Sequence, residues 1–218
     1  MRICIYGDSF APTTFRKVWP RLGFELVPME EAELFFFSQD TAIDPQGNRE
    51  QKSLIEPIKA IYSKIHVPLV LTSQVTPGFT RALNIPIYHM AETLRIKDAE
   101  TRALKPDYFV IGCNDRSVLL PTSLQDFFHA FKTPYLKVTY EEAEFSKIAV
   151  NMTLASQVDN ATRLSRAAHS LGIDWERVAE ILTYDKRIGA ESYMKPGRWQ
   201  DSQHLLRDYV TLKEIENG

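Results

Sequence analysis

The first half of the chain alternates short, continuous apolar runs with amphipathic segments. Continuous apolar runs are typical of strands that are covered on both faces of a sheet. Four such runs are ICIYG at 3–7, ELFFFS at 33–38, PLVLTS at 68–73 and YFVIG at 108–112. Between the second and third runs, residues 49–65 repeat apolar positions at helical spacing. The alternation predicts an α/β fold with a parallel sheet and crossover helices.

The second half has a different pattern, which predicts one long helix from about Thr139 to Leu171. Thr139 and Glu142 form the sequence signature of a capping box at its start, and Gly172 is a natural stop. A helix of about 30 residues is about 45 Å long, more than a small domain needs for its own core. Asp174 then caps a second helix. We therefore expect one domain over residues 1–138 and an all-α domain over residues 139–218.

The apolar stripe of the long helix indicates what it packs against. Its members are Phe145, Ile148, Met152, Ala155, Val158, Leu164, Ala168 and Leu171. Many small residues lie between them, and small residues allow a second helix to approach closely. Together with the length of the stripe, this predicts a homodimer built on the helix.

Composition and charge narrow the possible partners and the compartment. The formal net charge is −2 and no basic cluster is present, so nucleic acid is not expected as a partner. No apolar run approaches the roughly 20 residues that span a bilayer, and the N-terminus lacks the pattern of a signal peptide. The two cysteines, Cys4 and Cys113, lie in apolar runs, which favours buried thiols over a disulfide. We expect a cytoplasmic protein without a membrane partner.

Several stretches resemble the UDP-glucose/GDP-mannose dehydrogenase family. The most specific runs from AEFSKIAVNMTLASQVDN to RIGAESYMKPG, at 143–197, and is similar to the family's dimer-forming helix and the helix after it. Looser matches are AELFFFSQDTAIDPQG at 32–47, LTSQVTPGFTR at 71–81 and KPDYFVIG at 105–112. The resemblance implies a reduced Rossmann-like nucleotide-binding domain followed by a helical dimerisation domain, without the family's C-terminal nucleotide-sugar domain.

The resemblance also implies site residues. Enzymes of the family use NAD to oxidise a sugar alcohol twice, through a cysteine that captures the intermediate aldehyde. The positions that correspond to the family's catalytic lysine, asparagine, aspartate and glutamate are Lys147, Asn151, Asp208 and Glu92. The positions that correspond to its cofactor-binding residues are Gly7, Thr41, Ser73 and Gln74. From the residues alone, the favoured interpretation of Lys147 and Asn151 is a solvated helix face, and Thr41 is either a remnant of a cofactor-contacting threonine or a strand-end cap.

Two departures from the family pattern change the expected chemistry. The family's segment around its cysteine aligns without gaps on residues 197–208, and His204 occupies the cysteine position. An imidazole forms no stable thioester, so the second oxidation should fail. In the nucleotide loop, Gly7 is followed by Asp8 and Ser9, and a carboxylate there opposes phosphate. The segment with the ribose-binding acid also has no counterpart. NAD binding is therefore predicted to be weak or absent, and no metal is expected.

The favoured interpretation is a dimeric binding or scaffold protein, with a nucleotide sugar or a full-length family member as further partners. One alternative is a residual NAD-dependent nucleotide-sugar oxidoreductase. A second comes from GDS at 7–9, GCND at 112–115 and DSQH at 201–204, which resemble three blocks of GDSL/SGNH hydrolases. In that hydrolase, Ser9 would be the nucleophile, with Asp201 and His204 as its partners and Asn114 as an oxyanion donor. His204 is otherwise read as a surface residue.

Overall fold

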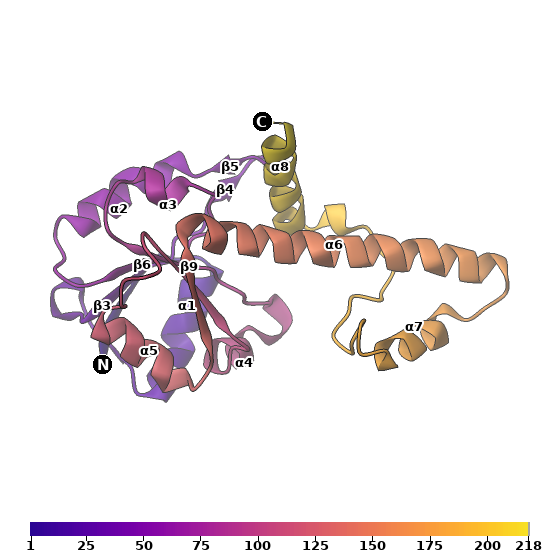
Figure 1. Cartoon of the computed structure of the whole chain (residues 1–218), viewed down its shortest axis with the longest axis horizontal. Coiled ribbons are helices and arrows are strands. Elements are labelled where there is room, and N and C mark those ends of the chain that lie inside the picture. The colour runs from indigo at the N-terminus through magenta and orange to yellow at the C-terminus, as the bar shows by residue number, and fades with distance from the viewer. Residues whose placement is uncertain (218) are drawn as a thin grey trace. The chain divides into compact units, whose positions relative to one another are not determined.

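A seven-stranded sheet with the strand order β2-β1-β3-β6-β7-β8-β9 organises the first part of the chain in the computed structural model, which describes residues 1–217 (Figure 1). The strands are β1 (Arg2–Tyr6), β2 (Glu25–Leu26), β3 (Leu34–Phe37), β6 (Leu69–Leu71), β7 (Tyr88–Met90), β8 (Phe109–Cys113) and β9 (Tyr135–Thr139). The short strands β4 (Ala42–Ile43) and β5 (Arg49–Glu50) form a separate pair. The four apolar runs of the sequence correspond to β1, β3, β6 and β8, which confirms the α/β prediction.

Strand β3 shows why its run is apolar without interruption. Leu34 and Phe36 are buried in one core cluster, whereas Phe35 and Phe37 are buried in another. Successive side chains of a strand point to opposite faces, so a strand buried on both faces needs an apolar residue at every position. Helices cover both faces of the sheet in Figure 1. The fully apolar pattern follows from that double cover.

The helices of this region are short. They are α1 (Phe10–Val18), α2 (Ile55–Tyr62), α3 (Phe79–Ala82), α4 (Ala99–Leu104) and α5 (Thr122–Phe131). The helix predicted over residues 49–65 is present only as α2, because Arg49–Glu50 pairs as a strand and a 3-10 turn at Lys52–Leu54 precedes the helix. On one face, Trp19 stacks on Phe15 at 4.2 Å between ring centroids and meets the edge of Phe127 at 5.1 Å. Clusters of aromatic rings of this kind add directional packing to burial.

The sheet is not parallel throughout. β1, β2, β3, β6 and β7 pair in parallel, but β8 pairs antiparallel with β7 and parallel with β9. The carboxyl ends of β8 and β9 therefore lie at the opposite edge of the sheet from those of β1, β3, β6 and β7. Strands β2, β7 and β9 were not predicted, because polar positions interrupt their apolar residues.

The long helix α6 (Tyr140–Ser170) has the predicted length and the predicted ends. The backbone N–H of Thr139 donates to the Glu142 carboxylate at 2.7 Å, and the N–H of Glu142 donates to the Thr139 hydroxyl at 3.3 Å. These two bonds are the reciprocal pair of a capping box. Gly172 follows the helix with φ +68°, the left-handed conformation that ends helices. The sequence prediction of this helix is confirmed.

Contacts divide the chain into two compact units. Unit 1 comprises Met1–Ala42 and Arg49–Lys147, and unit 2 comprises Ile43–Asn48 and the chain from Ile148 onward. Unit 1 thus includes the first turns of α6, whereas the sequence placed a domain boundary at residue 138. Unit 2 also contains α7 (Trp175–Tyr184) and α8 (Gln203–Asn217). The Asp174 carboxylate accepts a hydrogen bond from Glu176 N–H at 3.0 Å, which confirms it as the cap of α7. Over residues 1–217, no helix is long and apolar enough to cross a bilayer.

Candidate functional site: a sheet edge and a buried polar pair

The candidate cofactor residues follow the carboxyl ends of neighbouring parallel strands in unit 1. Gly7 follows β1, Thr41 follows β3, and Ser73 and Gln74 follow β6. Because β1, β3 and β6 pair in parallel, these residues lie at one edge of the sheet. Ligands of open α/β sheets bind at this edge, where the strand order reverses. In this sheet the reversal lies at β1, between β2 and β3.

The loop after β1 packs tightly against the end of β3. Gly7 has φ +119°, and a Cβ placed there would lie 2.9 Å from backbone atoms of Ser38. The Ser9 hydroxyl donates to the Ser38 carbonyl at 3.2 Å, and the Arg16 guanidinium donates to the Gly7 carbonyl at 2.6 Å. Asp8, between them, is exposed. In this loop Ser9 hydrogen-bonds to the neighbouring strand end, and Asp8 adds negative charge at the start of α1.

The loops after β3 and β6 are joined by hydrogen bonds. The Thr41 hydroxyl donates to the Gln74 carbonyl at 3.3 Å, and the Arg49 guanidinium donates to the same carbonyl at 3.2 Å. Both Thr41 and Ser73 are buried. The Ser73 hydroxyl has no hydrogen-bond partner among residues 1–217. Thr41 thus joins two loops, and Ser73 brings an unpaired buried hydroxyl to the same edge.

Glu92 follows β7, the next parallel strand, and its carboxylate accepts a hydrogen bond from the backbone N–H of Leu94. Its side chain is half-buried. Lys147 is likewise half-buried, on α6. The sheet edge therefore brings Glu92 to the same side as the candidate cofactor residues.

Two candidate catalytic residues meet in unit 2. The Asn151 side-chain amide donates to the Asp208 carboxylate at 2.5 Å, joining α6 to α8. Both side chains are buried. The guanidinium of Arg207, which is also buried, lies 3.9 Å from the Asp208 carboxylate. A buried carboxylate needs both hydrogen bonds and an opposite charge nearby, and this arrangement supplies them.

His204 lies in the first turn of α8 and is exposed. It is thus placed by the same helix as Asp208, one turn before it. No cysteine occurs in unit 2, because the only two in the chain are Cys4 in β1 and Cys113 in β8. Burial raises the pKa of both thiols above the ordinary value of 9.0. A raised pKa keeps a thiol protonated and unreactive.

The residues of the hydrolase alternative are separated by the topology of the sheet. Ser9 follows the carboxyl end of β1, whereas Asn114 follows the carboxyl end of β8 at the opposite edge. The side-chain oxygen of Asn114 accepts a hydrogen bond from Arg81 at 2.7 Å. An oxyanion donor must lie about 3 Å from the reacting atom. Asn114 therefore cannot serve Ser9. Asp201 and His204 belong to unit 2, whereas Ser9 belongs to unit 1.

The sequence did not predict one buried acid of unit 1, Glu144. Glu144 on α6 accepts hydrogen bonds from the backbone N–H groups of Gly78 at 2.6 Å and Thr80 at 2.8 Å. Burial raises the pKa of its carboxyl, although these hydrogen bonds oppose the shift. The signal available in the sequence was a glutamate between two apolar residues, Ala143 and Phe145, of the predicted helix. Within residues 1–217, no group of three or more His, Cys, Asp or Glu side chains is arranged to hold a metal.

Comparisons with known proteins find similarity to nucleotide-sugar dehydrogenases. Residues 141–216 match the central domain of the UDP-glucose/GDP-mannose dehydrogenase family. UDP-glucose 6-dehydrogenase YwqF of Bacillus subtilis is 25% identical over 212 residues, which cover 89% of this chain and 48% of that protein. GDP-mannose 6-dehydrogenase of Pseudomonas putida is 26% identical over 149 residues, covering 59% of this chain and 33% of that protein. The chain thus spans about half the length of the first relative and about a third of the length of the second.

Solved structures share the fold. A UDP-glucose dehydrogenase from Pyrobaculum islandicum has a TM-score of 0.72 and 20% identity, covering 99% of this chain and 68% of that one. A GDP-mannose dehydrogenase from Pseudomonas aeruginosa, solved as a ternary complex, has a TM-score of 0.72 and 16% identity, covering 100% and 68%. The fold is that of nucleotide-sugar dehydrogenases. Residues 141–216 are the part of the chain that matches the central domain of the UDP-glucose/GDP-mannose dehydrogenase family.

Proposed function

We propose that this protein is a relative of nucleotide-sugar dehydrogenases that does not oxidise sugars and acts as a dimeric binding or scaffold protein. The observation that carries the proposal is the absence of a cysteine from unit 2, which holds Asn151 and Asp208. Covalent capture of an aldehyde needs a thiolate that attacks and later leaves. His204 cannot replace it, because an imidazole forms no stable thioester.

The assay follows NADH production from NAD with UDP-glucose or GDP-mannose. We expect none above background for the wild-type chain, and no change in His204→Ala. His204→Cys places a thiol at the position aligned with the family's cysteine. This variant tests whether the missing thiol alone prevents turnover. Turnover in the wild type that disappears in His204→Ala would make the histidine catalytic and would support a residual oxidoreductase instead.

Weak binding of NAD is the second part of the proposal. The exposed carboxylate of Asp8 opposes phosphate at the start of α1, and the hydroxyl of Ser9 is engaged with the Ser38 carbonyl. The crossover after β2 is reduced to a 3-10 turn at Met29–Glu31, which leaves little protein to hold an adenosine ribose. Calorimetry should give a dissociation constant above about 10 μM, that is, binding weaker than about −7 kcal/mol. Tighter binding would contradict this part.

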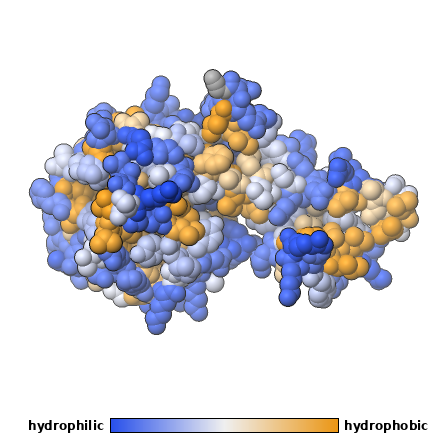
Figure 2. Space-filling view, viewed as in Figure 1, coloured by the Kyte–Doolittle hydropathy of each residue, from blue (hydrophilic) through white to orange (hydrophobic). Residues whose placement is uncertain are grey.

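An exposed apolar surface in unit 2 supports the dimer. We call it the α7 patch: it comprises Leu171, Ile173, Ile181, Tyr184 and Ile188, all exposed, and Ile181 and Tyr184 are 68% and 77% exposed. Figure 2 shows apolar residues gathered over α7 and the nearby end of α6. Exposed apolar surface of this kind marks interaction sites. We propose a second copy of this chain as its occupant, together with the long stripe of α6.

Light scattering at micromolar concentration should give the mass of a dimer. The interface between the two chains should bury more than about 1,000 Å² in total. Ile181→Glu should shift the protein toward monomer. Ile215→Glu, on the exposed face of α8, is the matched control and should not. A monomeric wild-type chain would contradict the dimer, and a mixed complex formed only with a full-length relative would replace the second copy by that partner.

A further inference from the structure

The hairpin formed by β4 and β5 crosses between the two compact units. Its tip, Ile43–Asn48, belongs to unit 2, whereas the residues on both sides of the tip belong to unit 1. The tip is bonded within itself: the Asp44 carboxylate accepts hydrogen bonds from the N–H groups of Gln46 at 2.9 Å and Asn48 at 2.8 Å. The Asp44 N–H also donates to the Asn48 carbonyl at 3.1 Å. Because of these bonds, a displacement of the stems is carried to the tip instead of being absorbed in it.

The tip packs against α8 through a buried glycine. A Cβ placed on Gly47 would lie 3.1 Å from Cγ2 of Val210 and 3.2 Å from Cγ of Leu206. Gly47 also has φ +92°, a conformation in which a side chain is strained. Glycine therefore allows the backbone of the tip to lie directly on two neighbouring turns of α8.

The helix α8 is held from two opposite sides. On one side, the Asp208 carboxylate accepts the hydrogen bond from the Asn151 amide of α6. Successive residues of an α-helix are rotated by about 100°, so Leu206 and Val210 lie about 160° from Asp208 around the helix axis. The turns of α8 that carry Asp208 therefore lie between α6 and the hairpin tip.

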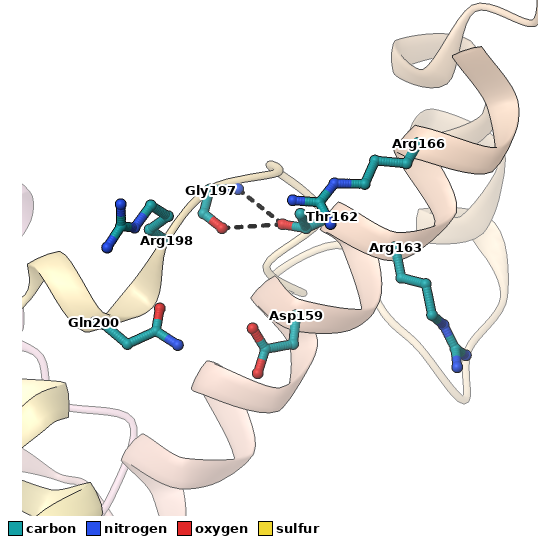
Figure 3. A pocket seen from close by; sticks show the side chains of 7 residues that line it. All are labelled: Asp159, Thr162, Arg163, Arg166, Gly197, Arg198 and Gln200. Carbon is teal, nitrogen blue, oxygen red and sulfur yellow. Dashed lines mark hydrogen bonds between the residues drawn. The ribbon is translucent and has the colours of Figure 1, made fainter. Parts of the chain in front are cut away.

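The segment before α8 has its own attachment to α6. The Thr162 hydroxyl accepts a hydrogen bond from Gly197 N–H at 3.0 Å and donates to the Gly197 carbonyl at 3.1 Å (Figure 3). The Trp199 indole donates to the Asp159 carboxylate at 2.8 Å. These bonds do not involve the hairpin. An effect of the hairpin should therefore be confined to the turns from Leu206 onward.

Both stems of the hairpin are bonded to the loop after β6. The Thr41 hydroxyl and the Arg49 guanidinium donate to the Gln74 carbonyl at 3.3 and 3.2 Å. The Gln51 side-chain amide donates to the Thr76 hydroxyl at 2.7 Å and accepts from the Thr76 N–H at 3.0 Å. Residues 74–76 thus fix the stems, and this loop carries one of the candidate cofactor residues.

We propose that the hairpin is a strap through which the loop after β6 controls how firmly α8 holds Asp208 against α6. A ligand or substitution that moves residues 74–76 shifts the stems, and the tip then presses less closely on Leu206 and Val210. Coupling of this kind is reciprocal, so loosening α8 must also loosen the loop. The strap goes beyond the proposed function and requires neither sugar oxidation nor NAD binding nor a dimer.

Hydrogen exchange of the full chain tests the strap. Gln51→Ala, a change in unit 1, should raise the exchange rates of residues 206–212 in unit 2 by about 5-fold, because two hydrogen bonds to Thr76 are lost. Gln125→Ala is the matched control, since it removes another glutamine of unit 1, whose amide donates to the Leu120 carbonyl at 2.7 Å. The control should leave the exchange of α8 unchanged.

Val210→Ala tests the reciprocal direction without straining the tip. It should raise the exchange rates of residues 74–78, and Gln51→Ala combined with it should add no further rise in α8, because both changes act through the same strap. Three results would each overturn the proposal. They are exchange in α8 that Gln51→Ala leaves unchanged, an equal effect of Gln125→Ala, and a uniform rise in all segments including β3, which reflects global destabilisation.

Discussion

The two units each bury one carboxylate on α6 or against it, and they stabilise it in different ways. In unit 1, the Glu144 carboxylate accepts hydrogen bonds from two backbone N–H groups at the start of α3. In unit 2, the Asp208 carboxylate accepts a hydrogen bond from the side-chain amide of Asn151 and lies near the guanidinium of Arg207. The first arrangement satisfies the backbone of a turn, and the second balances charge between side chains. Asp208, a candidate catalytic residue, therefore also has a structural role in joining α6 to α8.

The largest expected effect is the loss of folding stability in Asp208→Ala. Asp208→Ala leaves the Asn151 amide and the Arg207 guanidinium buried without this carboxylate, and removing one member of a buried charged group costs about 3–5 kcal/mol. Urea denaturation should show that loss, and hydrogen exchange should place it in α8 and the facing part of α6. Asp201→Ala is the control, since its side chain is 71% exposed and should change stability by less than about 1 kcal/mol.

Glu144→Ala should cost less, about 1–3 kcal/mol, because it leaves two backbone donors without an acceptor but no uncompensated charge. The loss should appear in the hydrogen exchange of residues 78–83. Glu100→Ala removes an exposed partner of Lys17 in the same unit and should have little effect. If Glu144→Ala proved as costly as Asp208→Ala, the distinction between the two carboxylates would fail.

The start of α6 offers a smaller, local test. Thr139→Ala removes the hydroxyl that accepts from Glu142 N–H, and loss of such a cap costs about 1 kcal/mol. Thr153→Ala, an exposed threonine in the same helix whose hydroxyl donates to the Ala149 carbonyl, is the matched control and should change stability by a few tenths of a kcal/mol. Equal effects of the two substitutions in thermal denaturation would remove the capping box as a determinant of where the helix begins.

The smallest expected effect is a difference in pH dependence. Burial raises the pKa of Glu144 above the ordinary value of 4.5, so the folded chain binds this proton more tightly than the unfolded chain. The corresponding stability is full below the ordinary value and is lost as the pH rises through the raised pKa. In Glu144→Gln this loss should be absent. Urea denaturation from acidic to neutral pH measures it as the wild-type minus variant difference, and parallel curves would contradict the raised pKa.

The sequence by itself determined the elements whose signals are local. Three strands that are buried at every position, β3, β6 and β8, followed from uninterrupted apolar runs, because a strand covered on both faces admits no polar alternation. The beginning and end of α6 followed from Thr139, Glu142 and Gly172, because a cap is formed by residues three or four positions apart. The edge that carries Gly7, Thr41 and Ser73 followed from a family resemblance and from the parallel sheet those runs predicted.

Only the tertiary structure decided how distant segments pair. The reversal at β8 depends on which strand it meets, and no local pattern distinguishes parallel from antiparallel pairing in a fully buried run. It is this reversal that places Asn114 across the sheet from Ser9. The hydrogen bond between Asn151 and Asp208 joins residues 57 positions apart, and the burial that makes it matter arises only when α8 packs on α6. Burial and pairing are properties of the assembled core, so the energetic weight of these residues is set there.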